Sequence, residues 1–272
     1  MEKFTRNQRI SAITKMLIEN PNKIINLNKF TEMFNAAKST ISEDLIAIKD
    51  ILIKLSIGRI ETIPGAAGGV RYVCGISKEE SIKFAEELCI ILQDRERIIP
   101  GNFLYVTDLM FNPEVIHKAG TILAAAFNKL DVDYVVTVET KGIPLAYEVA
   151  RMIGVQLVVV RRENKVTEGP TVSINYVSGS TNRIQNMSLS KRAIKPKSNC
   201  IFIDDFMKAG GTAFGIIDLL KEFDSQLVGT GVLVDNIDIK QKLVSDYVSI
   251  IEFNGLDENN NAVLQPSKKI KL

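Results

Sequence analysis

The chain contains 272 residues, of which 46% are hydrophobic, 24% charged and 7% aromatic, and its formal net charge is +2. This composition indicates a soluble protein with one large core or two smaller ones. The longest apolar runs, such as VQLVVV, are far shorter than the roughly 20 residues that cross a bilayer. The N-terminus MEKFTRNQRI lacks the apolar core of a secretion signal, so we expect a cytoplasmic protein.

The histidine and cysteine content narrows the possible site chemistry. His117 is the only histidine, which leaves no histidine cluster for zinc and favours a packing or surface role for this residue. Cys74, Cys89 and Cys200 are odd in number and form no CxxC pair. We therefore expect buried, reduced cysteines rather than disulfides or a metal site. No catalytic residue and no metal site made by protein ligands alone is predicted.

The charges divide the chain into two parts. Residues 1–73 contain 11 Lys/Arg and 7 Asp/Glu, a net charge of +4, which leaves 23 basic and 25 acidic residues in 74–272. A basic first part joined to a slightly acidic second part suggests a polyanionic partner for the first part alone. We predict two domains with these bounds.

The first 35 residues predict two helices. TRNQRISAITKMLIEN places Ile10, Ile13 and Leu17 on one face, and Asn20-Pro21 ends this helix. NLNKFTEMFN then predicts a short second helix. Its inward-facing residues are Leu27, Phe30 and Phe34.

Residues 38–58 predict a longer third helix that ends at Gly58. Thr40 with Glu43 fits a capping box at its start, and Ser39 is an alternative cap. The runs GRIETI and GVRYV alternate like two strands joined by the glycine-rich PGAAGG. The apolar positions of the third helix are Ile41, Leu45, Ile48, Leu52 and Leu55.

This order of elements resembles the winged-helix form of helix-turn-helix DNA-binding domains. Short polar groups at the start of the third helix can reach base edges or phosphates in a major groove. Arginines of the hairpin and of the first helix, with Lys15, can contact the DNA backbone. The candidate DNA-binding residues are Lys38, Ser39, Thr40, Ser42, Arg59, Arg71, Arg6 and Arg9. The alternative is a small helical oligomerisation domain with a solvated basic face.

The second part begins with a mostly helical stretch and then changes pattern. The strand-like runs DYVVTVE, VQLVVVRR, CIFIDD and LVGTGVLVDN alternate with the helical IPLAYEVARMIG and TAFGIIDLLKEF. Near-continuous apolar strands joined by helices predict an α/β fold with a parallel sheet that is buried on both faces. In such sheets, ligands bind beyond the carboxyl ends of the strands.

One strand is followed by an unusual combination of residues. In CIFIDDFMKAGGTAF, the strand ends at Asp204-Asp205 and a helix begins near Thr212. Free amides at a helix N-terminus, with glycines that permit close approach, bind phosphate. Two carboxylates upstream suit sugar hydroxyls or the surroundings of a magnesium ion. Together these groups predict a site for a ribose 5-phosphate.

The stretch IFIDDFMKAGGT resembles the phosphoribosyl-diphosphate signature of type I phosphoribosyltransferases. VETKGIPLAYEVA is similar to the diphosphate loop of that family, and VVVRRENKVTEGPTVSINYVSGS to its mobile loop and flanking hairpin. The resemblance implies that these segments bind phosphoribosyl diphosphate (PRPP). The implied residues are Asp204, Asp205, Phe206, Met207, Lys208, Ala209, Gly210, Gly211, Thr212, Lys141, Gly142, Arg161, Arg162 and Lys165.

The second part also departs from the enzyme pattern. Phe206 and Lys208 are bulkier than the residues that the enzymes usually carry there, and Lys208 can pair with a phosphate. No segment resembles the hood that grips a nucleobase, and the tail DENNNAVLQPSKKIKL is predicted to be poorly ordered. We therefore expect the fold without catalytic turnover.

A winged helix fused to a phosphoribosyltransferase-like domain resembles the purine operon repressors of Gram-positive bacteria, over essentially the whole chain. The resemblance implies a homodimeric regulator of purine biosynthesis and transport genes that binds double-stranded operator DNA and is released by PRPP, with Mg²⁺ as a companion ion. Other diphosphate-bearing nucleotides, alarmones among them, are possible competitors. The first alternative is an active purine phosphoribosyltransferase of the xanthine type. The second is an RNA-binding attenuator, against which the predicted wing argues.

Overall fold

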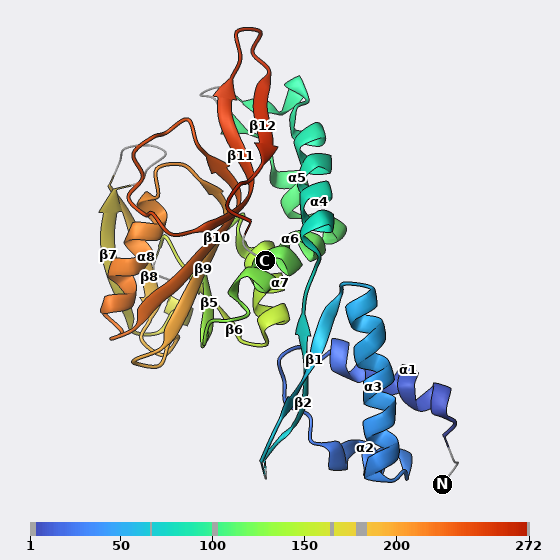
Figure 1. The fold of residues 1–272 in the computed structure, drawn as a ribbon. Helices are drawn as coiled ribbons and strands as arrows, with labels where there is room; N and C mark the ends of the chain where they lie inside the picture. The colour runs from blue at the N-terminus through green and yellow to red at the C-terminus, as the bar shows by residue number, and fades with distance from the viewer. Residues whose placement is uncertain (1–3, 66, 100–102, 164–165, 178–183, 271–272) are drawn as a thin grey trace. The chain divides into compact units, whose positions relative to one another are not determined.

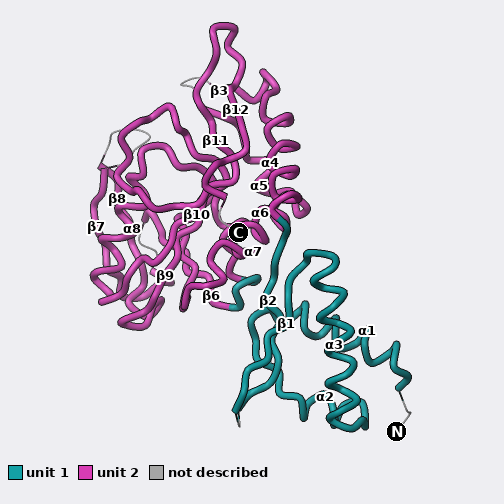
Figure 2. The backbone as a smooth tube through the Cα atoms, viewed as in Figure 1, with its two compact units in different colours: residues 1–77, 151–154 teal, residues 78–150, 155–272 magenta. Residues whose placement is uncertain are grey.

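The computed structural model describes residues 4–65, 67–99, 103–163, 166–177 and 184–270 (Figure 1). Its chain divides into two compact units (Figure 2). Unit 1 comprises Met1–Ser77 with Arg151–Gly154, and unit 2 comprises Lys78–Ala150 with Val155–Leu272. The first segment of unit 1 thus ends four residues after the predicted boundary at residue 73. None of the described helices is both long and apolar enough to span a bilayer.

Unit 1 contains three helices followed by an antiparallel hairpin, in the predicted order. The hairpin register pairs Gly58 with Cys74 and Ile63 with Gly69. An isolated bridge joins Ile25 to the hairpin strand that carries Val70. The elements are α1 (Arg6–Ile18), α2 (Leu27–Phe34), α3 (Lys38–Lys54), β1 (Gly58–Ile63) and β2 (Gly69–Cys74).

The apolar faces of the three helices form the core of unit 1. Most of the predicted inward residues are buried, whereas Ile10 and Leu27 are only partly buried. Leu55 differs most from the prediction, because α3 ends at Lys54 and the Leu55 side chain is 54% exposed. The buried residues are Ile13, Leu17, Phe30, Phe34, Ile41, Leu45, Ile48 and Leu52.

The helix caps differ from the prediction. The capping box lies on α1, where the Thr5 and Gln8 side chains each bond the backbone of the other residue. On α3 the N-cap is Ala37, which makes no side-chain cap bond, so the predicted caps by Thr40 and Ser39 are wrong. The reason is that α3 begins at Lys38, which places Ser39 and Thr40 inside the first helical turn rather than at the N-cap.

Unit 2 is built on a sheet that, among the described residues, has the order β12-β11-β10-β9-β5-β6. All neighbouring strands are parallel except β12, which runs antiparallel to β11. The predicted parallel α/β fold is therefore confirmed, with one antiparallel edge strand. The strands are β5 (Tyr134–Val138), β6 (Gln156–Val160), β9 (Asn199–Met207), β10 (Gln226–Asn236), β11 (Val248–Leu256) and β12 (Ala262–Pro266).

Helices cover both faces of this sheet (Figure 1). Figure 1 shows α4 to α7 on one side, and α8 with the antiparallel hairpin β7–β8 on the other. The first set is α4 (Lys78–Leu92), α5 (Thr107–Met110), α6 (Pro113–Phe127) and α7 (Ile143–Ile153). The second set is β7 (Thr171–Val177), β8 (Ile184–Ser190) and α8 (Gly211–Lys221).

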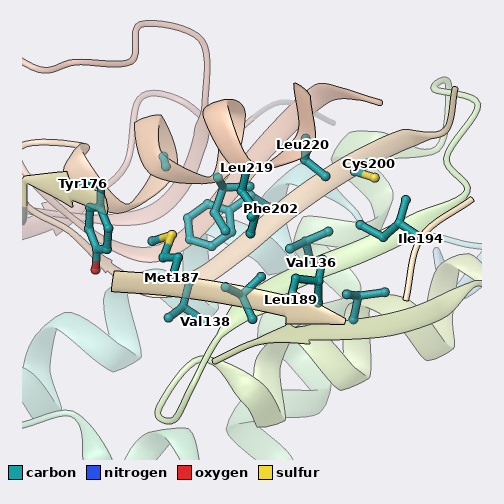
Figure 3. Close-up of a cluster of buried hydrophobic side chains, with 14 of the residues drawn as sticks. Val136, Val138, Tyr176, Met187, Leu189, Ile194, Cys200, Phe202, Leu219 and Leu220 are labelled. Carbon is teal, nitrogen blue, oxygen red and sulfur yellow. The ribbon is translucent and has the colours of Figure 1, made fainter. Parts of the chain in front are cut away.

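The core of unit 2 explains why consecutive residues of its strands are apolar. Val136, Val138 and Phe202 face α8 and the β7–β8 hairpin, where Leu219 packs on them (Figure 3). Ile201 and Ile203, one position away, lie toward α6. Burial on both faces therefore produces the near-continuous apolar strands of the sequence.

Three features of unit 2 differ from the prediction. Strand β9 continues to Met207, two residues beyond the acidic pair, and β11 was not predicted. The tail is not poorly ordered, because β12 pairs along β11 and the buried Glu252 carboxylate accepts the backbone amide of Lys268 at 3.0 Å. The mostly helical stretch also contains η1 (Arg95–Arg97) and a short hairpin, β3 (Ile98–Ile99) with β4 (Phe103–Leu104).

The cysteines and the histidine lie where they were predicted. Cys74, Cys89 and Cys200 are buried, and within the described residues none of them forms a disulfide. His117 is on the surface of α6, with its Nδ1 2.8 Å from the Glu148 carboxylate.

Candidate functional sites

The last residues of β9 carry the acidic pair. The Oδ1 atom of Asp204 accepts the backbone amide of Asp205 at 2.9 Å. Burial raises the pKa of Asp204 well above its usual value, and the adjacent charge of Asp205 raises it further. Within the part of the chain that the structure describes, neither carboxylate forms an ion pair. Such a pair is stabilised by hydroxyl donors or by a cation that a ligand brings.

The loop that follows β9 leads into the N-terminus of α8. Gly210 is the N-cap, with a φ of 81°, which a glycine adopts without strain. No side chain caps α8, and its first turn contains no acidic residue. The free amides and the helix dipole therefore favour an anion at this position.

The loop between β5 and α7 meets the acidic pair. Lys141 is exposed, whereas Gly142 is buried against Asp204. A Cβ atom on Gly142 would lie 2.8 Å from both Asp204 Oδ1 and Thr137 Oγ1. Thr137 is fully buried, and its hydroxyl has no hydrogen-bond partner among the described residues. A buried hydroxyl without a partner beside the partly buried Asp204 carboxylate indicates a polar ligand or water.

The three cations predicted for the mobile loop have different positions. The Arg161 guanidinium lies 3.1 Å from Glu139 Oε2 and 3.4 Å from Glu168 Oε1, so it binds carboxylates of the protein itself. Arg162 has an exposed side chain that lines the cavity beside the acidic pair. Lys165 lies outside the described residues.

One cavity of about 690 Å³ brings most of the predicted ligand residues together. This volume falls within the usual range for small-molecule sites, roughly 300–1,000 Å³. Gly142 and Arg161 are not among its lining residues. The predicted residues that line it are Asp204, Asp205, Phe206, Met207, Lys208, Ala209, Gly210, Gly211, Thr212, Lys141 and Arg162.

An apolar wall of the cavity was missed by the sequence reasoning. It comes from β3, β4 and the residues just after them, for which no part in the site was predicted. The Nζ atom of Lys208 lies 4.6 Å from the centre of the Phe103 ring, which is a cation–π contact. The signal for this hairpin was the Pro100-Gly101 dipeptide between two apolar runs, which marks a turn. The wall residues are Ile99, Phe103, Leu104 and Val106.

The start of α3 presents the predicted short polar residues of unit 1. Lys38, Ser39 and Ser42 are exposed and Thr40 is partly buried. The Ser42 hydroxyl donates to the Lys38 carbonyl at 2.9 Å, and the first turn of α3 contains no acidic residue. This helix start is therefore suited to an anionic partner.

The predicted arginines of unit 1 are engaged with carboxylates. Arg59 and Arg71 of the hairpin each lie 2.7 Å from Glu61. Partial burial raises the pKa of Glu61, but the hydrogen bonds from Arg71 and Arg59 outweigh it and hold the pKa below its usual value. Both side chains remain partly exposed, so they can still approach a phosphate.

The arginines of α1 bind the buried Asp44 of α3. Arg9 Nε lies 2.7 Å from Asp44 Oδ2, and its side chain is 12% exposed. Arg6 Nε lies 3.6 Å from Asp44 Oδ1, and its side chain is 64% exposed. Arg9 thus anchors α1 to α3, whereas Arg6 keeps most of its surface for another partner.

Comparisons with known proteins follow the same division. A family model for the N-terminal domain of the bacterial purine repressor matches residues 5–74. A family model for the phosphoribosyl transferase domain matches residues 106–269. The adenine phosphoribosyltransferase of Thermoanaerobacter pseudethanolicus shares the fold of unit 2, with a TM-score of 0.54 at 19% identity over 62% of this chain and 99% of that chain.

Two curated relatives match along almost the whole chain. The purine biosynthesis transcriptional repressor PurR of Bacillus subtilis strain 168 is 46% identical over 261 residues, which cover 96% of this chain and 92% of the relative. The purine biosynthesis transcriptional activator PurR of Lactococcus lactis subsp. lactis strain IL1403 is 40% identical over 258 residues, 95% of each chain. Together with the two family models, these matches show that the chain belongs to the bacterial PurR family of purine biosynthesis transcriptional regulators.

Proposed function

We propose that this protein is a DNA-binding repressor of purine biosynthesis and transport genes, and that PRPP binds in the cavity of unit 2 as an inducer that weakens DNA binding. The observation that carries the ligand assignment is the cavity. It joins an acidic pair, an amide-rich loop at a helix N-terminus, and the cations Lys141 and Arg162. These are the groups that a sugar carrying a phosphate and a diphosphate requires.

Each part of PRPP would meet a different part of the cavity. The 5-phosphate would accept the amides of the loop 208–212, with the Thr212 hydroxyl as an added donor. The ribose hydroxyls would donate to Asp204 and Asp205, which would offset the cost of the adjacent carboxyl groups. The diphosphate would lie near Lys141 and Arg162, and Lys165 would close over it.

Mg²⁺ would fit this site only together with the ligand. No three His, Cys, Asp or Glu residues gather to hold a metal ion in the described ranges. The acidic pair supplies oxygen atoms of the kind that Mg²⁺ prefers, and phosphates usually complete the coordination of this ion. The ion would then neutralise charge between the carboxylates and the diphosphate.

Coupling to DNA requires that PRPP bind more tightly to the free protein than to its DNA complex. We propose a homodimer, because winged-helix regulators commonly bind two half-sites and a dimer supplies two copies of α3. The direction of regulation needs a test of its own, since one relative is named a repressor and the other an activator.

The test is binding of the full-length protein to promoter DNA of a purine operon, at a stated salt concentration, with and without Mg²⁺ and PRPP. We expect tight binding that PRPP releases, and a promoter–reporter fusion that is derepressed when the protein is deleted. Specific binding that PRPP does not change would contradict the inducer. Loss of reporter expression on deletion would indicate an activator.

A second candidate function is an active purine phosphoribosyltransferase of the xanthine type. The observation that favours it is the apolar wall, which offers a nucleobase a surface in the same cavity as the acidic pair. We expect no turnover, and an assay of diphosphate release with xanthine, hypoxanthine and adenine tests this directly. Diphosphate-bearing nucleotides, alarmones included, are proposed competitors for the same cavity, to be tested by displacement of PRPP.

A further inference from the structure

The loop 208–212, which we call the phosphate loop, is supported from behind by a loop between β10 and β11. We call residues 237–246 the brace segment. The Lys242 side chain, 10% exposed, donates to the carbonyls of Lys208 at 2.9 Å and Asn236 at 2.8 Å. It lies 3.5 Å from the Met207 carbonyl as well. One ammonium group thus joins the end of β9 to the end of β10, although it lies 34 residues from Lys208 in the chain.

The brace segment holds the next peptide group too. The amide of Leu243 donates to the Ala209 carbonyl at 2.9 Å. Gly210 packs so closely that an added Cβ would lie 3.0 Å from Val244 Cγ2. Two consecutive carbonyls of the phosphate loop, those of Lys208 and Ala209, are therefore directed toward the brace segment.

These two carbonyl contacts fix the direction of the loop amides. In a trans peptide the N–H and C=O groups point in opposite directions, and these peptides are trans. The amides of Ala209 and Gly210 are thus directed away from the brace segment, toward the side on which the loop lines the cavity. Among the described residues, neither amide donates a backbone hydrogen bond. Successive free amides on one side of a loop bind anions.

The ammonium group is fixed in place by a buried carboxylate. Asp235 is fully buried and bonds Lys242, Tyr247 Oη at 2.9 Å and Lys269 Nζ at 3.0 Å. Burial lowers the pKa of Lys242, and the hydrogen bond to Asp235 opposes this shift. Asp235 therefore keeps a cation beneath the loop, where its charge polarises the peptide groups and strengthens their amides as donors.

We propose that Lys242 is a positioning residue of the ligand cavity, which holds the amides of Ala209 and Gly210 as a cradle for the phosphomonoester of the ligand. The proposal rests on the proposed binding of a phosphorylated ribose in this cavity. Lys242 does not line the cavity, so its effect is exerted through the backbone of the loop.

Lys269 provides a matched control. Lys242→Met and Lys269→Met each remove one ammonium group from Asp235 and leave it the other lysine and Tyr247. Only Lys242 contacts the phosphate loop. Should Lys242→Met fail to fold, Lys242→Gln retains the two N–H donors of its amide without the charge and serves in its place.

The experiment is calorimetric titration of the full-length protein and both variants with PRPP, ribose 5-phosphate and inorganic diphosphate. We expect Lys242→Met to weaken binding of PRPP and ribose 5-phosphate about tenfold, a loss typical of a group that orients the direct ligand contacts. Diphosphate should bind all three proteins within about twofold, because it uses Lys141 and Arg162. Lys269→Met should bind every ligand within about twofold of the unsubstituted protein.

The outcomes separate the two proposals. Unchanged binding of ribose 5-phosphate by Lys242→Met would overturn the positioning role and leave PRPP binding intact. If Lys242→Met lost diphosphate binding as much as ribose 5-phosphate binding, or if Lys269→Met had the same effect, the loss would reflect general distortion. Either result would also overturn the positioning role. If the unsubstituted protein bound neither PRPP nor ribose 5-phosphate, the proposed function itself would fail.

Discussion

The two units use their carboxylates in opposite ways. In unit 1, Glu61 lies between Arg59 and Arg71, and its pKa is held below the usual value. In unit 2, Asp204 lies beside Asp205, and its pKa is raised well above the usual value. The carboxylate of the hairpin pairs with arginines of its own unit, whereas Asp204 and Asp205 form no ion pair among the described residues.

The buried aspartates of the two units, in contrast, resemble each other. Asp44 and Asp235 are both buried, and each is bound by two cations. These pairs hold elements together, α1 with α3 in one unit and the brace segment with β10 in the other. Carboxylates paired with cations thus support the fold, whereas the adjacent Asp204 and Asp205 mark the proposed binding site. Four predictions test this difference, from the largest expected effect to the smallest.

The double variant Asp204→Ala with Asp205→Ala should lose the response to PRPP. Without hydroxyl acceptors, PRPP affinity should fall by about 100-fold or more, since hydrogen bonds to charged groups contribute roughly 1.5–3 kcal/mol each. The measurement is titration of PRPP into the protein–DNA complex. DNA binding without ligand should be unchanged, and its loss in a well-folded double variant would refute a role confined to the ligand.

Arg9→Ala should destabilise unit 1 by about 2–3 kcal/mol, because it leaves the buried Asp44 with only the distant Arg6. Arg6→Ala is the matched control and should cost less than about 1 kcal/mol, since Arg6 is mostly exposed. Hydrogen exchange of α1 and α3 reports the local stability. Equal effects of the two substitutions would show that Arg9 does not anchor α1.

Gly142→Ala should weaken PRPP binding by about tenfold, the effect expected when a close-packed group must shift. The added methyl group would lie 2.8 Å from Asp204 Oδ1 and Thr137 Oγ1, so it would displace the acidic pair. Calorimetric titration measures the loss, and DNA binding without ligand is the control. An unchanged PRPP affinity would mean that the ligand does not need Asp204 in its present position.

Asp204→Asn should raise the melting temperature at neutral pH by about 2–4 °C. A carboxyl group whose folded pKa is raised holds its proton more tightly in the folded state, so its ionisation destabilises the fold as pH rises from the unfolded pKa toward the folded one. The amide removes this cost, and the gain should vanish below about pH 3, where the carboxyl is protonated in both the folded and the unfolded state. Thermal unfolding between about pH 3 and neutral pH is the measurement; a gain that persists at about pH 3 would have another cause.

The helices of unit 1 and four strands of the unit 2 sheet could be predicted because they depend on local patterns. Helical spacing predicted α1 to α3, and the apolar runs predicted β5, β6, β9 and β10. The prediction of a poorly ordered tail was wrong because its order depends on a partner that is distant from local patterns. Its composition is polar, and β12 is ordered because β11, an unpredicted strand, supplies its hydrogen-bond partners. The cap prediction for α3 was wrong because the helix begins at Lys38, before both Ser39 and Thr40.

The sequence by itself determined the order of the two units. It also determined the loop 208–212, since a strand, two acidic residues and a glycine-rich helix start are contiguous in the chain. Only the tertiary structure decided which cationic side chain pairs with which carboxylate. It directs Arg161 to Glu139 and leaves Arg162 at the cavity, and it joins Arg9 to Asp44, 35 residues away. The physical reason is that a charge contributes according to the partner it meets and its burial, and both depend on residues that are distant in the chain.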